Sequence, residues 1–167
     1  QPWNPKLLKN FKHLNKFMVK AGQYNGKQYG IPADWGFDAI LYRSDKVHPR
    51  AKSWGLLFDE RYKGKIAWFD DLNMLVMAGL YLHHPRPWRQ SDAELKKSRD
   101  FLIKKKKLAR LIWSSETALW EAFGSGDIWV AYAWPNDWVQ MKKKKLKVVY
   151  MRPREKPIAW VGMFMLL

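Results

Sequence analysis

Two adjacent carboxylates, Asp70 and Asp71, stand where a short β-rich run, Lys65–Phe69, gives way to an apolar stretch that predicts a helix over Leu72–Leu82. An Asp at a helix start accepts hydrogen bonds from free backbone N–H groups, so capping is one interpretation of the pair. In the other, one carboxylate caps the helix while its neighbour faces a ligand beyond the carboxyl end of the strand, where open α/β sheets bind ligands.

Further polar and aromatic residues lie at or near the carboxyl ends of predicted strands. They are Asp71, Ser114 or Ser115, Trp134 followed by Asn136 and Asp137, and Trp160. Carboxylates and aromatic faces together suit a cationic or amine-bearing ligand, through ion pairing and cation–π contact. The alternative is that the aromatic residues belong to the core and that the two serines cap a helix.

We find no catalytic, cofactor or metal motif, and therefore predict a protein that is not an enzyme. The segment Gly124-Ser125-Gly126 lacks the remainder of a phosphate-binding loop. His83 and His84 have no partner at metal-ligand spacing and are interpreted as loop residues. The chain has no cysteine, which excludes disulfides and thiolate chemistry.

The composition describes a globular chain with a strongly basic surface. Among 167 residues, 47% are hydrophobic and 11 are Trp, which is too apolar for a disordered tail. No apolar run has the length of a transmembrane helix, and we see no signal peptide at the start. The formal net charge of +16 favours anionic partners such as nucleic acid or anionic lipid.

Two lysine runs follow predicted helices and carry part of this charge. Either they are solvated helix ends, where cations suit the helix dipole, or they bind a polyanion. The residues concerned are Lys104, Lys105, Lys106, Lys107, Lys142, Lys143, Lys144 and Lys145.

The order of elements predicts an α/β fold with a mostly parallel sheet flanked by helices. A helical spacing follows Pro5 up to Lys20, and two short strands are expected at 28–31 and 37–42. Ser91 and Glu94 form a capping box that predicts a helix to about Lys106. The other expected strands are 65–69, 108–113, 127–134, 146–151 and 158–167, and the other expected helices are 72–82, 115–124 and 136–143, with a short turn over 53–58.

Several segments, taken in order, resemble the polyamine (spermidine/putrescine) branch of bacterial extracytoplasmic solute-binding proteins, the receptors of ABC importers. The segments are 29–36 (YGIPADWG), 52–58 (KSWGLLF), 62–66 (YKGKI) with Asp70 and Asp71, 91–95 (SDAEL) and 130–134 (VAYAW).

The resemblance implies two α/β lobes that close over a ligand, and hence a periplasmic-binding-protein-like lobe in this chain. Residues 1–50 would be a remnant of the first lobe with a crossing strand, 51–158 the second lobe, and 159–167 the strand that crosses back. It also implies an irregular segment in place of the helix over 5–20. The chain then resembles a truncated lobe with a deliberately charged surface. The resemblance further implies a periplasmic or extracytoplasmic location and a membrane permease as partner.

Carried over by position, the resemblance assigns ligand-binding roles to Asp71, to Ser114 or Ser115, and to Trp134 and Trp160. The further candidates for ligand binding are Trp35, Glu116 and Asp137. Glu116 and Asp137 are the carboxylates able to substitute for two that the family has and this chain lacks. Met74 stands where polyamine binders have Glu, and Gly162 where they have Asp. We therefore expect binding of a polyamine or other small amine-like ligand to be altered.

The apolar strand expected over 158–167 predicts self-association into a homodimer if it is left without a partner. The competing functional hypothesis for the whole chain is a basic interaction module that binds nucleic acid or another polyanion.

Overall fold

The structure is a computed structural model that describes residues 1–167. Contacts divide the chain into two units, one formed by residues 1–37 and 159–167 and the other by residues 38–158. The division falls inside a long strand, β3 (Gly30–Arg43), earlier than the boundary expected near residue 50. The assignment of the units to receptor lobes stays a proposal.

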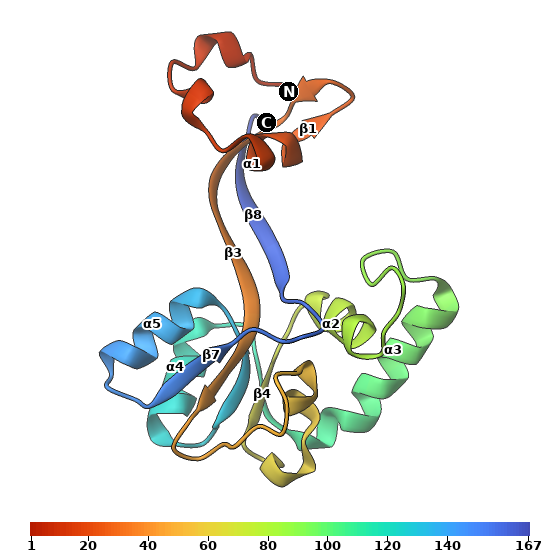
Figure 1. Cartoon of the computed structure of the whole chain (residues 1–167), viewed down its shortest axis with the longest axis vertical. Helices are drawn as coiled ribbons and strands as arrows, with labels where there is room; N and C mark the ends of the chain where they lie inside the picture. Colours follow the sequence, from red (N-terminus) through yellow and green to blue (C-terminus); the bar gives the residue numbers. More distant parts are fainter. The chain divides into compact units, whose positions relative to one another are not determined.

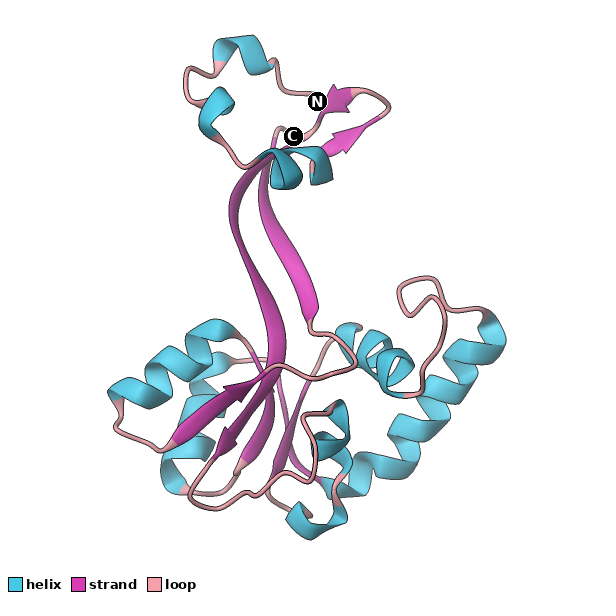
Figure 2. Ribbon diagram, viewed as in Figure 1, coloured by secondary structure: helices cyan, strands magenta, loops and turns pink.

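The larger unit contains five strands of a mixed six-stranded sheet, in the order β5-β4-β6-β3-β7 (Figures 1 and 2). Strand β4 is parallel to both β5 and β6, whereas β3 is antiparallel to β6 and β7. Because β7 opposes β3, it points the same way as the other three, which confirms the predicted mostly parallel sheet. The strands besides β3 are β4 (Ile66–Phe69), β5 (Ala109–Trp113), β6 (Val130–Ala133) and β7 (Val148–Met151).

Helices lie on both sides of this sheet, as the alternation of elements predicts. Figure 2 shows α2 and α3 on one side and α4 and α5 on the other. Their bounds are α2 (Asn73–Tyr81), α3 (Asp92–Lys105), α4 (Glu116–Ser125) and α5 (Pro135–Lys143). Short 3-10 turns complete the unit: η3 (Trp54–Phe58), η4 (Glu60–Tyr62) and η5 (Lys106–Leu108).

The local signals at two of these elements act as expected. The Ser91 hydroxyl accepts from the N–H of Glu94, and the Glu94 carboxylate accepts from the N–H of Ser91 at 2.8 Å, which confirms the capping box of α3. The Ser53 hydroxyl accepts from the N–H of Gly55 at the start of η3. The ring of Trp54 in η3 then stacks on Tyr132 of β6, with centroids 5.5 Å apart, and joins the turn to the sheet.

The smaller unit has little regular structure apart from its strands. It holds η1 (Pro5–Leu7), η2 (Phe11–His13) and α1 (Lys16–Ala21), so a single helix from Pro5 to Lys20 is wrong and the irregular segment implied by the resemblance is right. A hairpin of β1 (Gln23–Tyr24) and β2 (Lys27–Gln28) follows.

One continuous strand, β3, replaces the two short strands expected at 28–31 and 37–42. It pairs with β8 (Ile158–Met165), whose last residues include the exposed side chains of Phe164 and Met165. A homodimer formed through this strand stays a prediction. None of the helices combines the length and the apolar character that crossing a bilayer requires.

Candidate ligand-binding site

The carboxyl ends of three parallel strands meet at one edge of the sheet, because β4 pairs in parallel with both β5 and β6. Aromatic rings from the ends of these strands pack together there. The Phe69 ring lies 4.5 Å from Trp113 and 5.1 Å from Trp134, and Trp113 and Trp134 are 5.3 Å apart between centroids. With Tyr132, 5.7 Å from Phe69, these rings form what we call the edge cluster.

The edge cluster is partly core and partly surface, so the core interpretation of the aromatic residues holds only for its buried members. Trp113 and Tyr132 are buried, and the Trp113 indole N–H donates to the carbonyl oxygen of Tyr132 at 3.2 Å. Phe69 and Trp134 are half-buried and present ring surface to solvent. Such surface can contact an apolar or cationic group of a ligand.

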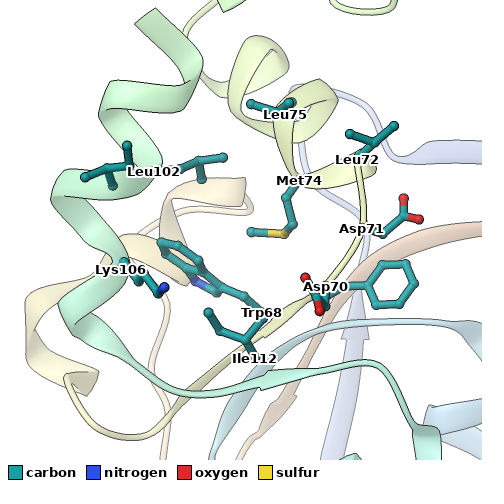
Figure 3. A pocket seen from close by; sticks show the side chains of 11 residues that line it. Trp68, Asp70, Asp71, Leu72, Met74, Leu75, Leu102, Lys106 and Ile112 are labelled. Atoms are coloured by element: carbon teal, nitrogen blue, oxygen red, sulfur yellow. The ribbon is translucent and has the colours of Figure 1, made fainter. Parts of the chain in front are cut away.

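The two adjacent carboxylates have different partners. Asp71 is exposed, and its Oδ1 accepts from the backbone N–H of Asn73, the first residue of α2, at 2.8 Å. The Asp70 carboxylate makes no hydrogen bond or ion pair within the chain, while its backbone N–H donates to Trp113 O at 2.8 Å. In Figure 3 the side chains of Asp70 and Asp71 point in different directions, and both residues line the same pocket. Asp71 is therefore the capping residue of the pair, with one oxygen still available.

The serines at the end of β5 retain their hydroxyls for other contacts. Ser114 and Ser115 are both exposed, and neither hydroxyl makes a hydrogen bond within the chain. Ser115 stands at the N-cap position of α4 but makes no capping bond through its side chain. Ser115 therefore occupies the expected N-cap position, but neither serine caps the helix through its hydroxyl.

The two carboxylates expected to substitute for missing family residues are already engaged. Glu116 is half-buried, and its Oε1 accepts from Asn136 Nδ2 at 3.1 Å. Asp137 is fully buried, and its oxygens accept from the backbone N–H of Trp134 and the indole N–H of Trp120, both at 2.7 Å. Burial raises the pKa of Asp137 to about 6, the two N–H groups act against that rise, and the nearby Glu116 adds to it. Asp137 thus fixes the backbone of Trp134 by a hydrogen bond, and its carboxylate is inaccessible to solvent.

Tyr132 of the edge cluster also belongs to a buried Asp–Tyr pair. The Tyr132 hydroxyl donates to Asp38 Oδ2 at 2.6 Å, and Asp38 is fully buried. Burial, followed by the charge of Asp38, raises the pKa of Tyr132 far above its ordinary value, and the charge of Asp71 adds to the rise. The field of Asp71 therefore reaches the edge cluster.

Beside Asp70 and Asp71 is a cavity of about 560 Å³, between α2, α3 and the ends of β4 and β5 (Figure 3). Its apolar lining includes Trp68, Met74 and Leu102, and its charged lining residues are Asp70, Asp71 and Lys106. No three His, Asp or Glu side chains of the chain are grouped so as to hold a metal ion.

The remaining predicted residues, Trp35 and Trp160, belong to the smaller unit and are described within it. A Cβ on Gly36 would come within 2.5 Å of the Trp160 ring, and one on Gly162 would collide with the Asp34 carboxylate. Asp34 therefore occupies the space that a side chain at position 162 would need. Alternation along β3 places Trp35, which is 61% exposed, on the face opposite Asp34 and Gly36.

Sequence reasoning missed two residues at this edge, Phe69 and Asp38, and left the roles of Asp70 and Asp71 open. Phe69 is the last residue of β4 and reads as an ordinary core residue. The sequence predicts that Asp70 caps or binds, with Asp71 favoured as the ligand contact, whereas both residues line the cavity and only Asp71 accepts a capping hydrogen bond. Asp38 carries no local signal at all, because its partner Tyr132 is 94 residues away in sequence.

Comparison with known proteins agrees with this geometry. Residues 4–166 match the model of a family described as bacterial extracellular solute-binding protein. Among solved structures, a spermidine/putrescine ABC transporter substrate-binding protein, PotD, from Streptococcus pneumoniae superposes with a TM-score of 0.80 at 16% identity, over 98% of this chain and 50% of its own. A putative spermidine/putrescine ABC transporter from Listeria monocytogenes gives 0.81 at 20% identity, over 99% and 51%.

A third solved structure is similar to the same extent. The lipoprotein Tp0655 (TpPotD) of Treponema pallidum gives a TM-score of 0.79 at 14% identity, over 97% of this chain and 53% of its own. At these identities the likeness shows the fold, a periplasmic-binding-protein-like α/β lobe. The chain spans about half the length of the solved structures that it matches.

Proposed function

The chain belongs to the family of bacterial extracellular solute-binding proteins, and from that premise we propose that it binds a small amine-bearing solute at the carboxyl edge of its sheet. In this proposal it serves as the extracytoplasmic solute-binding component of an ABC importer, with a membrane permease as partner. The solved relatives named for spermidine and putrescine support an amine as the ligand.

The observation that carries the proposal is the convergence at one edge of an exposed carboxylate, half-buried aromatic rings and two free hydroxyls. They are Asp71, the edge cluster with Phe69 and Trp134, and Ser114 with Ser115. An ammonium group can pair with Asp71, lie against an aromatic face and donate to a hydroxyl. Within the smaller unit, we propose Trp35 and Trp160 as ligand-contacting residues.

The chemistry of the edge favours a ligand with fewer cationic groups than a polyamine. Met74 is buried and supplies no charge, and Asp137 is sealed in the protein. Charge-assisted hydrogen bonds contribute roughly 1.5–3 kcal/mol each, so a second ammonium without a carboxylate partner gains little. The net charge of +16 also opposes the approach of a polycation.

No structural observation calls for the competing polyanion module. The lysine runs lie at the C-terminal ends of α3 and α5, where cations are stabilised by the helix dipole, and Lys105 pairs with Glu60 at 2.9 Å. The runs therefore have a structural account without a nucleic-acid partner.

Calorimetric titration with putrescine, spermidine and monoamines, at low and high salt, tests the proposal. We expect saturable binding of at least one amine with modest salt dependence, lowered several-fold by Asp71→Asn and by Trp134→Ala. The matched control is Asp92→Asn, which removes an exposed carboxylate from the first turn of α3. Absence of binding to every amine, or an equal loss in the control, contradicts the proposal. Steep loss of binding to a polyanion with salt would instead favour the basic module.

A further inference from the structure

The cavity between α2 and α3 has an apolar floor that offers a ligand no unpaired hydrogen-bonding group. Trp68 and Ile112 are partners in the β4–β5 register, so their side chains point to the same face of the sheet. The Trp68 indole N–H is already used by the carbonyl oxygen of Leu57 at 3.2 Å. Leu75 and Leu102 complete walls that suit a hydrocarbon chain.

The charged groups of this cavity lie on opposite sides of that floor. Figure 3 shows Asp70 near the start of α2 and Lys106 at the end of α3, with Trp68 between them. Neither side chain has a hydrogen-bond or ion-pair partner in the chain, whereas the neighbouring Lys105 is paired with Glu60. The chain has about twice as many cationic as acidic residues, so the unpaired carboxylate gives this cavity a negative group that most of the basic surface lacks.

We propose that this cavity selects a linear ω-amino carboxylate, with its ammonium at Asp70, its methylene chain over Trp68 and its carboxylate at Lys106. The inference rests on the proposed function for amine recognition at this edge, and it names the class of solute. Lys106 attracts an anionic terminus and repels a second ammonium. A diamine or polyamine is therefore the poorer ligand for this cavity.

Three ligands of equal chain length isolate the effect of the far end group. They are 6-aminohexanoate, hexylamine and 1,6-diaminohexane, titrated by calorimetry at pH 7 and low salt. We expect 6-aminohexanoate to bind roughly two- to fivefold more tightly than hexylamine, the range of one exposed ion pair. We expect 1,6-diaminohexane to bind more weakly than hexylamine by a similar factor. Glycine carries both charges but lacks the chain to span the floor, and should bind least.

Variants at the far end then test the assignment. Lys106→Gln should remove the preference among the three six-carbon ligands, and Lys106→Glu should reverse it in favour of 1,6-diaminohexane. Lys104→Gln is the matched control, because Lys104 is an exposed lysine two residues before Lys106, at the end of α3, that does not line the cavity. Asp70→Asn should weaken all three ligands, and thermal unfolding verifies that each variant is folded.

The outcomes separate this inference from the function on which it rests. Equal affinities for the three ligands, unchanged by Lys106→Glu, overturn the inference and leave amine binding at the edge in place. Binding of none of them overturns the inference, and the titrations with putrescine, spermidine and monoamines then decide whether the edge binds an amine at all. A preference for 1,6-diaminohexane in the unmodified protein also overturns the inference.

Discussion

The backbone N–H of Asp70 donates to the carbonyl oxygen of Trp113 at 2.8 Å, which continues the β4–β5 pairing one residue beyond Phe69 and Trp113. This bond fixes the main chain of Asp70 at the edge of the sheet. The next carboxylate, Asp71, accepts from the N–H of Asn73 and closes the first turn of α2. Two neighbouring residues of the same type thus have different functions, one in the fold and one beside the cavity.

This division predicts different effects of the two residues on stability. Asp71→Ala should lower the free energy of unfolding by about 1 kcal/mol, because it removes a hydrogen bond to a free N–H at the start of a helix. Asp70→Ala should change it by less than about 0.5 kcal/mol, because its side chain bonds to nothing within the chain. Urea unfolding measures both, and a larger loss in Asp70→Ala would contradict the assignment.

The hydroxyl of Tyr132 is predicted to stabilise the larger unit through Asp38. Tyr132→Phe removes a 2.6 Å donor to a fully buried carboxylate, and should lower the free energy of unfolding by about 1–3 kcal/mol. Tyr81→Phe is the matched control, since Tyr81 packs on Phe58 and its hydroxyl makes no hydrogen bond within the chain. Equal effects of the two substitutions in urea unfolding would show that the buried pair contributes nothing specific.

Asp137 should impose a pH dependence on stability. Its pKa is about 6 in the folded protein and 3.8 ordinarily, so between pH 4 and 6 the folded state binds more protons than the unfolded state. The free energy of unfolding contributed by this residue is therefore highest below about pH 4, falls as the pH rises to about 6, and is constant above that. The total fall is on the order of 3 kcal/mol.

The difference between the unmodified protein and Asp137→Asn isolates this contribution. The pKa of the exposed Asp45 is lowered to about 2, mainly by its hydrogen bond to Arg43. Its contribution to the free energy of unfolding therefore changes at lower pH and in the opposite direction. Urea unfolding at intervals from pH 3.5 to 7 should show a decline for the unmodified protein relative to the variant between pH 4 and 6. Parallel curves for the two proteins across that range would refute the assignment of the raised pKa.

Sequence alone predicts the parts of this fold that local signals determine. The capping box of Ser91 and Glu94 fixes the start of α3, and the apolar run that contains β6 indicates a strand covered on both faces. The direction of the strands follows from the alternation of strand and helix. The convergence of Asp71, Ser114 and Trp134 at one edge follows from that direction.

Sequence reasoning fails where pairing between distant residues overrides the local signal. Pro32 and Gly36 indicate a break, yet β3 continues through both, and it pairs with β8. Gly36 lacks a side chain because the Trp160 ring occupies that space, and Trp160 is more than a hundred residues away in sequence. The burial of Asp137 depends likewise on Trp120 from another helix. The different orientations of Asp70 and Asp71 appear only when the cavity is seen.

Gly36 is predicted to be intolerant of a methyl group. In Gly36→Ala the new Cβ would lie 2.5 Å from the Trp160 ring, and the rigid indole has no flexible end that could move aside. Overpacking of this kind lowers the free energy of unfolding by about 1–3 kcal/mol. Gly124→Ala is the contrasting variant: it lies in α4, where the nearest atom to a new Cβ is Lys144 Nζ at 3.9 Å, and should raise the free energy of unfolding by about 0.5–1 kcal/mol.

A double-mutant cycle tests the cause of the loss in Gly36→Ala. If the Trp160 ring is the obstacle, Gly36→Ala should cost much less in a Trp160→Ala background, and the coupling between the two positions should exceed about 0.5 kcal/mol. An unchanged loss in that background would place the strain in the β3 backbone. Coupling would show that the Trp160 ring packs against β3. Less of the ring surface would then be available for the solute contact proposed for Trp160.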